Sequence, residues 1–255
     1  HGMNNFEKKK LFWSNKKVFI TGHTGFKGSW LSFTLKILGA KVYGYSLKPP
    51  TNPSLFNIIK LKNLLEKSII ADVRNKKKLS KSLKLIKPDI IFHLAAQPLV
   101  LDSYKYPYET FQTNFLGTLN VLDCAKKIKN NKCNIIVTTD KVYKSSNKKI
   151  YNELDKLGVT DPYGSSKVTA EIVAESYIKS IDNINSKYLK TATVRAGNVV
   201  GGGDFSKHRL VPDYLKSLKN KKKLLIRNPH YIRPWQFVME PIFGYLLLAE
   251  KIVKK

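Results

Sequence analysis

Tyr163 and Lys167 lie four residues apart in the run YGSSK, where a helix is expected to begin. That spacing places a phenol and an ammonium group on the same face of a helix. A free phenol has a pKa of about 10, so a tyrosine base needs nearby positive charge to act near neutral pH. A lysine and a nicotinamide ring both favour the phenolate. The pair therefore predicts proton abstraction coupled to nicotinamide redox chemistry.

The position of this pair matters, because the Y-x-x-x-K pattern also arises by chance. Thr138, Thr139 and Asp140 lie shortly before it, where the β-rich run Ile135–Thr139 ends. Doubly wound sheets place their chemistry at the carboxyl ends of their strands. The strand end and the Tyr–Lys pair together predict one catalytic centre.

A glycine-rich turn with the spacing G-x-x-G-x-x-G lies between a β-rich run, Lys17–Thr21, and a helical pattern, Phe26–Leu38. Glycine permits backbone conformations and close approaches that a Cβ would block. The following helix offers free N–H groups and its positive dipole end to a pyrophosphate. The strand-turn-helix context predicts a dinucleotide-binding turn. We expect its cofactor contacts at Gly22, Thr24, Gly25, Phe26, Lys27 and Gly28.

The end of the second expected strand, Lys41–Tyr45, leaves the choice between NAD and NADP open. An acidic residue there would bond the ribose 2′-hydroxyl of NAD. The strand is followed instead by the neutral Ser46, and Lys48 would tolerate a phosphate. After the third strand, Asp72 and Val73 are placed either for the adenine or in an ordinary turn. NAD is the expected cofactor, with NADP as the alternative.

These strands belong to an alternation of strand-like and helix-like patterns that predicts an α/β fold with a parallel, doubly wound Rossmann sheet. We expect a dinucleotide-binding domain over residues 12–200 and a smaller substrate-binding domain over 201–255, where the alternation weakens. Further expected strands are Ser68–Asp72, Ile90–Leu94, Leu189–Arg195 and Leu224–Arg227. Further expected helices are Lys76–Ile86, Tyr108–Lys129, Ser165–Ile181, Val211–Leu218 and Ile242–Val253.

The composition disfavours several other classes of protein. The 255 residues carry a formal net charge of +28, yet five of the 46 basic residues are Arg, and the lysines are scattered. Base-reading surfaces favour Arg, so we expect no nucleic-acid partner. No apolar run reaches the length of a membrane span, and no signal-peptide pattern is visible. Two cysteines are too few for a disulfide framework or zinc site, so we expect no metal and a cytoplasmic location.

The glycine turn, the run Leu94-Ala95-Ala96-Gln97, Asn114, the Thr139 strand end and the Tyr–Lys pair resemble those of extended short-chain dehydrogenase/reductases. Longer runs resemble, more narrowly, the CDP-glucose 4,6-dehydratases. These runs are FITGHTGFKGSWL, GYSLKPPTNPSLF, TTDKVY, DPYGSSK, RAGNVVGGGD and RPWQFVMEPIFGYLLLAE. The resemblance extends from about Phe12 to Lys251, nearly the whole chain.

This resemblance implies conversion of a nucleotide-sugar, CDP-glucose, to its 4-keto-6-deoxy form, with NAD used and regenerated. Tyr163, supported by Lys167, would take the C4 hydroxyl proton, and Thr139 would hydrogen-bond the same oxygen. Asp140 would protonate the leaving C6 hydroxyl. Lys141 stands where the wider group has a glutamate base at C5, so it either removes the C5 proton or only orients Asp140.

The resemblance also implies the remaining ligand contacts. Further cofactor contacts would come from Leu94, Ala95, Ala96, Asn114 and Thr138, together with Tyr163 and Lys167. Substrate contacts would come from Gln97, Ser103, Asn198, Arg209 and Arg233. A guanidinium group suits a diphosphate because it pairs with phosphate as a fork, while surface ion pairing is the alternative for both arginines.

The family implies a homodimer or higher homo-oligomer, paired through the helices expected at Tyr108–Lys129 and Ser165–Ile181. It also implies a role in deoxysugar supply for lipopolysaccharide or capsule. Members are usually longer at the C-terminus, so we expect the substrate domain here to be incomplete. Two alternatives remain open: a related epimerase or dehydratase for a GDP-, dTDP- or UDP-sugar, and a non-catalytic dinucleotide- or nucleic-acid-binding protein. Asp140 disfavours the epimerase, and the intact catalytic set disfavours the non-catalytic protein.

Overall fold

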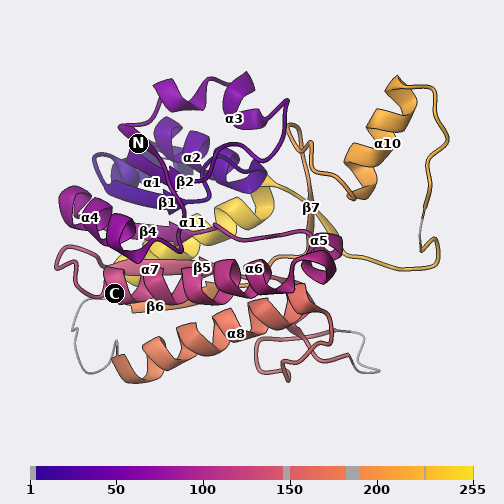
Figure 1. The fold of residues 1–255 in the computed structure, drawn as a ribbon. Helices are drawn as coiled ribbons and strands as arrows, with labels where there is room; N and C mark the ends of the chain where they lie inside the picture. Colours follow the sequence, from indigo (N-terminus) through magenta and orange to yellow (C-terminus); the bar gives the residue numbers. More distant parts are fainter. Residues whose placement is uncertain (1–3, 146–149, 182–189, 227, 255) are drawn as a thin grey trace.

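Six parallel strands form the central sheet of the computed structural model (Figure 1), which describes residues 4–145, 150–181, 190–226 and 228–254. The strand order is β3-β2-β1-β4-β5-β6, which is the doubly wound Rossmann order. The predicted α/β fold is therefore confirmed. The strands are β1 (Lys17–Thr21), β2 (Lys41–Ser46), β3 (Lys67–Ile70), β4 (Ile90–His93), β5 (Cys133–Val137) and β6 (Lys190–Val194).

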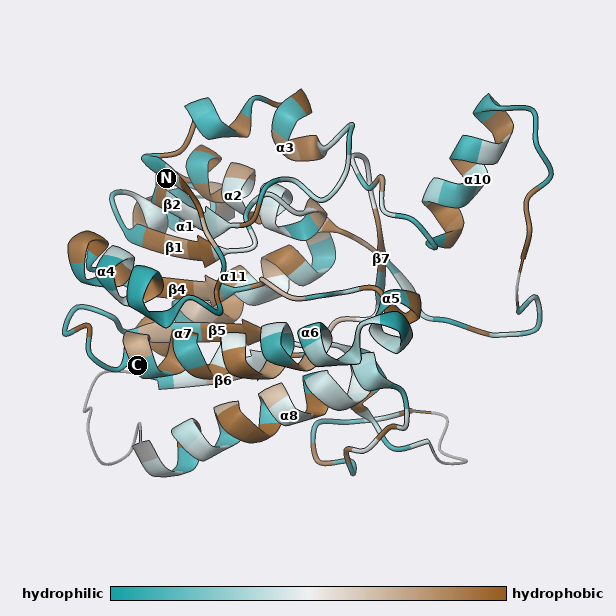
Figure 2. Ribbon diagram, in the orientation of Figure 1, coloured by the Kyte–Doolittle hydropathy of each residue, from teal (hydrophilic) through white to brown (hydrophobic). Residues whose placement is uncertain are grey.

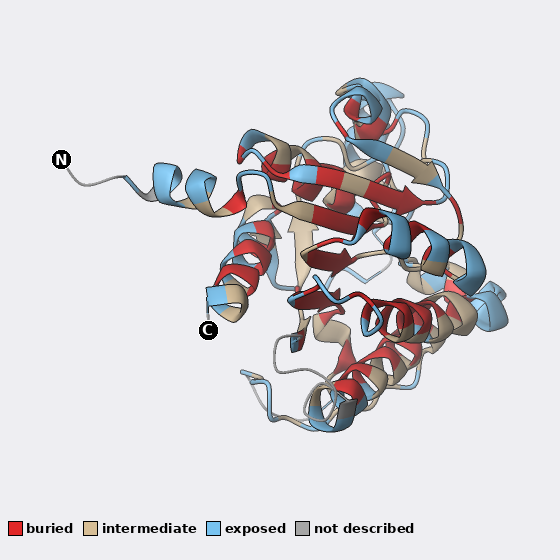
Figure 3. Cartoon of the chain, turned by 90° about the vertical axis from the view of Figure 1, so that its left-hand side faces the viewer, coloured by how far each residue is buried: buried red, intermediate tan, exposed pale blue. Residues whose placement is uncertain are grey.

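Successive residues of the strands point to opposite faces of the sheet, and both faces are covered by helices. Val18 and Ile20 of β1 pack into one apolar cluster, while Phe19 between them packs into the other. In β4, Ile90 packs into the first cluster and Ile91 packs into the second. Figure 3 shows the strands between the helical layers, with β1, β4 and β5 largely buried. Continuous apolar runs in β4 and β5 are what strands buried on both faces require.

The first face is covered by α2 (Phe26–Ile37) and α11 (Met239–Lys254), and the second by α4 (Lys76–Ile86), α7 (Gly117–Ala125) and α8 (Pro162–Ser176). A π-helical turn, Tyr177–Ile181, continues α8. Shorter elements include α1 (Asn5–Trp13), α3 (Leu55–Ile58), α5 (Val100–Lys105), α6 (Pro107–Phe111) and 3₁₀ turns at Leu61–Asn63 and Asp140–Val142.

Two predicted elements need correction. The helix expected over Tyr108–Lys129 is interrupted, because α6 passes through a π-helical turn, Gln112–Leu116, before α7, which ends at Ala125. The strand expected over Leu224–Arg227 does not form. Residues 224–226 have no regular structure and no strand pairs with them, and Arg227 lies outside the described residues.

The residues after 200 divide between two places. In α11, Ile242 and Leu246 are fully buried in the cluster that contains β1 and β5. By contrast, α10 (Leu210–Lys219) has no buried residue and stands away from the sheet, with apolar and polar residues interleaved along it (Figure 2). Nearer the sheet edge, β7 (Asn198–Val200) pairs with β8 (Trp235–Phe237) in parallel. We propose that α11 belongs to the dinucleotide-binding unit.

Within the described ranges, no helix is both long enough and apolar enough to cross a bilayer.

Candidate active site

A cleft of about 590 Å³ lies at the carboxyl edge of the sheet, between the strand ends and the segment 201–235. Doubly wound sheets bind ligands at this edge, near the point where the strand order reverses. The predicted site residues that line the cleft are Lys27, Thr138, Thr139, Lys141, Tyr163, Asn198, Arg209 and Arg233. The described part of the chain contains no cluster of His, Cys, Asp or Glu suited to a metal ion.

The glycine turn after β1 is packed tightly against its own backbone. Gly22 has a φ of +79°, and a Cβ there would lie 2.7 Å from the amide nitrogen of Ala95. A Cβ at Gly28 would lie 2.0 Å from the carbonyl oxygen of Gly22. Gly25 differs, because its nearest neighbour would be 3.4 Å away. It is the N-cap of α2 and makes no side-chain cap bond, which fits the close approach of a pyrophosphate to the helix end.

Thr24 and Ser46 join the glycine turn to the end of β2. The Thr24 hydroxyl donates to the Leu47 carbonyl at 2.9 Å, and its oxygen lies 2.9 Å from the Ser46 oxygen. Because the single hydroxyl proton of Thr24 is directed at Leu47, Ser46 is the donor within the pair. This strand therefore ends on two linked hydroxyl groups where a carboxylate would favour NAD.

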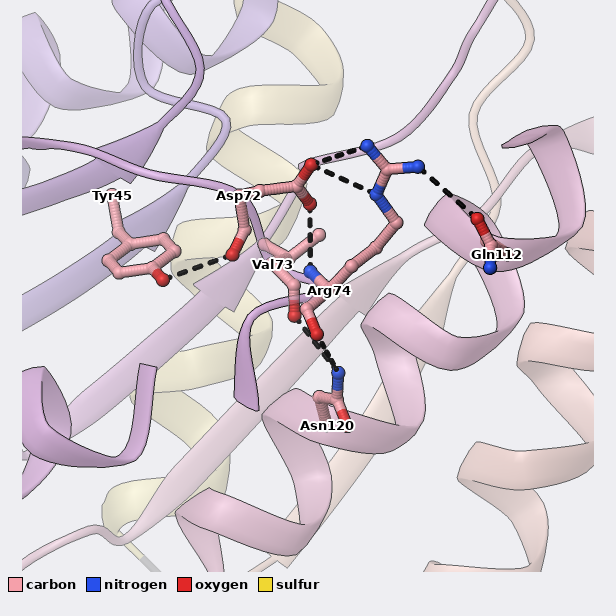
Figure 4. Close-up of polar contacts among 6 residues, drawn as sticks. All are labelled: Tyr45, Asp72, Val73, Arg74, Gln112 and Asn120. Atoms are coloured by element: carbon pink, nitrogen blue, oxygen red, sulfur yellow. Dashed lines mark hydrogen bonds and ion pairs between the residues drawn. The ribbon is translucent and has the colours of Figure 1, made fainter. Parts of the chain in front are cut away.

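Asp72, expected near the adenine, is held by Arg74 (Figure 4). Its carboxylate accepts hydrogen bonds from the Arg74 backbone N–H at 2.8 Å, Nε at 2.9 Å and Nη2 at 2.6 Å. Burial opposes ionisation, but the bonds from Arg74 outweigh it and lower the pKa of Asp72. Asn120 donates to the Val73 carbonyl at 3.1 Å. Sequence reasoning missed Arg74, which a basic residue two positions after a strand-end Asp could have indicated.

The segment after β4 lies against the glycine turn. The Leu94 N–H donates to the Thr21 carbonyl at 3.1 Å, and the Ala95 N–H donates to the Thr21 hydroxyl at 3.2 Å. Ala96 continues this segment without regular secondary structure. The three residues thus lie close to the turn on which a dinucleotide would rest.

Gln97, Ser103 and Asn114 were expected to contact ligands, but their side chains are bonded within the protein. Ser103 is fully buried, and its hydroxyl donates to the Val100 carbonyl at 2.7 Å and accepts from the Tyr163 N–H at 3.1 Å. Asn114 is also fully buried, and the amides of Gln97 and Asn114 bond to neighbouring segments. Their ligand contacts stay predictions, and within the protein these side chains hold the loop and the start of α8.

Thr139, Asp140 and Lys141 form the turn that follows β5. The Thr139 hydroxyl donates to Asp140 Oδ1 at 3.2 Å. The Lys141 ammonium donates to Asn198 Oδ1 at 3.0 Å and lies 3.6 Å from the Asp140 carboxylate. Both side chains of that ion pair are 30% exposed, so an acid and an amine lie together within reach of the cleft.

Tyr163 and Lys167 lie one turn apart at the start of α8, and both are buried. Burial raises the pKa of Tyr163, and a hydrogen bond with Thr139 opposes that effect. The Lys167 ammonium donates to the Val137 carbonyl at 3.1 Å. Burial, followed by the positive charge of Lys27, lowers the pKa of Lys167 to about 7. The expected activation of the phenol is therefore incomplete in the protein alone, because burial has the largest influence on it.

Lys27, in the first turn of α2, adds a further amine to the cleft. Burial lowers its pKa to about 8, the positive charges of Arg209 and Lys141 act in the same direction, and Asp140 opposes them. Several basic groups thus lie close together in a partly enclosed space. Such a cleft favours an anionic ligand.

Arg209 and Arg233 lie on the opposite wall of the cleft. Arg209 Nη1 donates to Asp204 at 2.8 Å, so its charge already has a partner. Arg233 is exposed, and its guanidinium group lies 5.3 Å from the centroid of the Tyr231 ring. The expected pair of arginines is therefore unequal, with Arg233 the more open of the two.

Comparison with known proteins identifies close relatives by sequence. A model of the GDP-mannose 4,6 dehydratase family matches residues 19–253. The CDP-glucose 4,6-dehydratase of Salmonella typhimurium is 48% identical over 249 residues, which is 95% of this chain and 68% of that enzyme. The dTDP-D-glucose 4,6-dehydratase of Dictyostelium discoideum is 32% identical over 225 residues, which is 83% of this chain and 50% of that enzyme. The chain is thus shorter than both relatives.

Solved structures share the fold at lower identity. The epimerase Mth375 of Methanothermobacter thermautotrophicus has a TM-score of 0.83 at 21% identity, covering 98% of this chain and 72% of that one. DesIV, a dTDP-glucose 4,6-dehydratase of Streptomyces venezuelae solved with NAD, has a TM-score of 0.80 at 22% identity, covering 91% and 71%. At these identities the likeness concerns the fold.

Proposed function

The chain belongs to the GDP-mannose 4,6 dehydratase family, and on that premise we propose that it is an NAD-dependent nucleotide-sugar 4,6-dehydratase acting on CDP-glucose. The observation that carries this proposal is that Thr139, Lys141 and Tyr163 line one cleft, with the Asp140 carboxylate beside Thr139 and Lys141. The Salmonella relative, at 48% identity, supports the choice of CDP-glucose. The product would be CDP-4-keto-6-deoxyglucose, and the enzyme a hydro-lyase.

The residues around the glycine turn fit a dinucleotide. The free N-cap position of Gly25 leaves room for a pyrophosphate at the start of α2, and the segment Leu94–Ala96 flanks it. Asp72 and Val73 would hold the adenine end, with Arg74 keeping the carboxylate ionised. A nicotinamide dinucleotide held by these residues would supply the oxidant for C4 and, once reduced, the reductant for C6.

The first step needs a base at the C4 hydroxyl. Tyr163 would take this proton, and Thr139 would hydrogen-bond the same oxygen. Lys167, held against the Val137 carbonyl, would contribute positive charge near the phenol. Because burial raises the pKa of Tyr163, the phenolate needs the further positive charge of the nicotinamide.

The second step removes water across C5 and C6. The new ketone acidifies the C5 hydrogen, and Asp140 would protonate the leaving C6 hydroxyl. Lys141 contacts both Asp140 and Asn198, so it would either remove the C5 proton or orient the acid. We propose the first role, because no glutamate follows Asp140 in the sequence.

Substrate recognition falls to the opposite wall of the cleft. Arg233 would pair with the diphosphate as a fork, since it is open, and Arg209 would join it only on leaving Asp204. Asn198 would contact the sugar through the amide group that Lys141 leaves free.

We also propose a homodimer formed through the outer faces of α6–α7 and α8. Large apolar side chains are exposed there and on α5, among them Tyr104, Tyr108, Phe115 and Ile172. A cytoplasmic location and a role in deoxysugar supply for lipopolysaccharide or capsule follow as proposals from the reaction. Sedimentation at several concentrations tests the dimer, and Ile172→Lys is expected to shift it to monomer.

The function is tested by incubation with NAD and, in turn, CDP-glucose, dTDP-glucose and GDP-mannose. Formation of a 4-keto product is followed by its absorbance in alkali. We expect turnover of CDP-glucose above the other two. Turnover of a non-CDP sugar alone would overturn the substrate assignment, and an epimerised product would overturn the reaction.

Asp140→Asn separates the two steps. The amide keeps the shape of the side chain but is far too weak an acid to protonate the C6 hydroxyl. We expect oxidation at C4 to continue while water loss falls by about 10²-fold or more. Mass spectrometry of the quenched reaction should then show the 4-keto sugar that still carries its C6 hydroxyl. Unchanged water loss would exclude Asp140 as the acid.

A further inference from the structure

A buried carboxylate, Glu171, lies on α8 one turn beyond Lys167 and is 4% exposed. It accepts a hydrogen bond from the Thr138 hydroxyl at 2.6 Å and one from Arg195 Nε at 2.9 Å. A second Arg195 nitrogen bonds the other carboxylate oxygen, which makes the ion pair bidentate. The Glu171 carboxylate and the Arg195 guanidinium group therefore neutralise each other inside the protein, where an unpaired charge would be strongly unfavourable.

These three residues come from three elements that meet at the cleft. Thr138 follows β5 and immediately precedes Thr139, while Arg195 follows β6. Glu171 stands on the same helix as Tyr163 and Lys167. The carboxylate is therefore a direct mechanical link between the helix that carries the base and the turn that carries the acid. We call Thr138, Glu171 and Arg195 the clamp.

The clamp reaches one segment further. The Arg195 guanidinium lies 4.8 Å from the centroid of the Tyr143 ring, and it donates to the Glu153 carbonyl at 3.4 Å. Tyr143 follows the Asp140–Val142 turn directly. Arg195 therefore holds Tyr143, the residue that follows the turn, and Thr138 holds the start of the turn.

The same carboxylate also acts on the charge of Lys167. Burial and Lys27 lower the pKa of Lys167, and Glu171 opposes them. His93, from β4, faces Lys167 as well and is kept neutral by burial, which lowers its pKa to about 3. Loss of the Glu171 charge would therefore favour a neutral Lys167.

We propose that Glu171 and Arg195 are positioning residues of the dehydratase, which fix Thr139 and Asp140 in register with Tyr163 and Lys167. The proposal rests on the function proposed above. Neither residue lines the cleft, so both act through Thr138 and the helix rather than by touching the substrate. Geometry of this kind is exacting, because a displacement of about 1 Å at a reacting group lowers rates by about 10²-fold.

A purely structural role would also make Glu171 important, so the test needs a matched control. Glu250 provides one: it is buried, accepts from Trp13 Nε1 at 2.8 Å and pairs with Lys9 at 3.5 Å, far along the chain on α11. Glu171→Gln and Glu250→Gln make the same chemical change. Both variants should lower the melting temperature.

Steady-state kinetics then distinguish the two roles. We expect Glu171→Gln to lower kcat by about 10- to 100-fold with little change in KM, and Glu250→Gln to leave kcat unaltered. Because Thr138 itself lines the cleft, its variants are compared by hydrogen exchange and not by turnover. The proposal is overturned if Glu171→Gln loses no more activity than Glu250→Gln.

Hydrogen exchange gives a readout that needs no substrate. The amides of Thr139, Asp140 and Lys141 should exchange about tenfold faster in Thr138→Val and Glu171→Gln than in the unmodified chain. Glu250→Gln should leave these amides unaltered. Unchanged exchange in both clamp variants refutes the positioning role, even if the unmodified chain turns over none of the sugars tested, a result that would refute only the proposed function.

Discussion

The two walls of the cleft differ in how firmly the protein holds them. On the sheet side, Thr139, Tyr163 and Lys167 are each less than a tenth exposed, and hydrogen bonds within the turn, to α5 and to the end of β5 hold them. On the other side, α10 has no buried residue, and Ile232 is 95% exposed. The sheet side of the cleft, which we call the catalytic wall, is part of a packed core. The side that carries α10 and Arg233, which we call the recognition wall, lies over it with few buried contacts.

This difference separates two tasks of an enzyme of this kind. Chemistry requires groups placed to within fractions of an ångström, and a buried sheet edge provides that placement. Recognition of a flexible diphosphate needs mainly charge of the right sign within reach. Changes on the catalytic wall should therefore act on kcat, and changes on the recognition wall should act on KM.

Removal of the catalytic phenol should give the largest effect. Tyr163→Phe keeps the ring but leaves no group to take the C4 proton, so we expect kcat to fall by about 10²- to 10⁴-fold. The rate of 4-keto product formation measures this loss. Tyr104→Phe, at an exposed position on α5, is the control and should be active. A Tyr163→Phe enzyme with normal turnover would show that another group is the base.

A pair of leucine substitutions tests the difference in packing between the walls. Leu246 of α11 is fully buried, and Leu246→Ala should lower the free energy of unfolding by about 2–5 kcal/mol through loss of contacts and the cavity it leaves. Leu215 of α10 is 57% exposed, and Leu215→Ala should change that free energy by no more than about 0.5 kcal/mol. Urea unfolding measures both. Equal losses would mean that α10 is as firmly packed as α11.

The same contrast explains what could be predicted from the sequence. The bounds of α4, Lys76–Ile86, match the prediction because its apolar periodicity is strong and Asn75 caps it. Strands β1, β4 and β5 are buried on both faces, so their apolar runs are conspicuous. The strand predicted over Leu224–Arg227 was wrong for the opposite reason. A short β-rich run forms a strand only where a neighbouring strand pairs with it, and sequence alone does not show that partner.

The candidate site divides along a similar line. Its chemical groups, such as Tyr163 and Asp140, could be predicted because their types and spacing are distinctive. The burial of Ser103 could not be predicted, because it depends on how α5 meets α8 in space. Glu171 was missed for the same reason, although its position one helical turn after Lys167 was a usable signal.

Arg233 tests the recognition wall itself. Arg233→Ala removes a fork that we expect to pair with the diphosphate, and a hydrogen bond to a charged group contributes about 1.5–3 kcal/mol. We therefore expect KM for CDP-glucose to rise by about 10- to 100-fold with kcat nearly constant. Arg233→Lys, which keeps the charge but not the fork, should recover part of the loss. A fall in kcat instead of a rise in KM would place Arg233 in the chemistry.

The smallest expected effect concerns the stability of the catalytic wall. Burial holds the pKa of Lys167 near 7, well below that of a free lysine, so the folded protein binds this proton less tightly than the unfolded chain does. The resulting loss of stability is complete below about pH 7 and is relieved as pH rises toward the unfolded value. Lys167→Met should therefore raise the melting temperature most at pH 6–7 and progressively less toward pH 10.

The gain in stability should come with a loss of turnover, because we propose that the same ammonium group supports the phenol as a base. About 2–4 °C is expected for each kcal/mol relieved in a chain of this size. The lost bond to the Val137 carbonyl offsets part of the gain at every pH, so the pH dependence of the difference is the diagnostic quantity. Lys81→Met, at an exposed position on α4, is the control and should show no such dependence. If the difference in melting temperature between Lys167→Met and the unmodified chain is constant from pH 6 to 10, Lys167 has an ordinary pKa. Its charge then does not destabilise the catalytic wall.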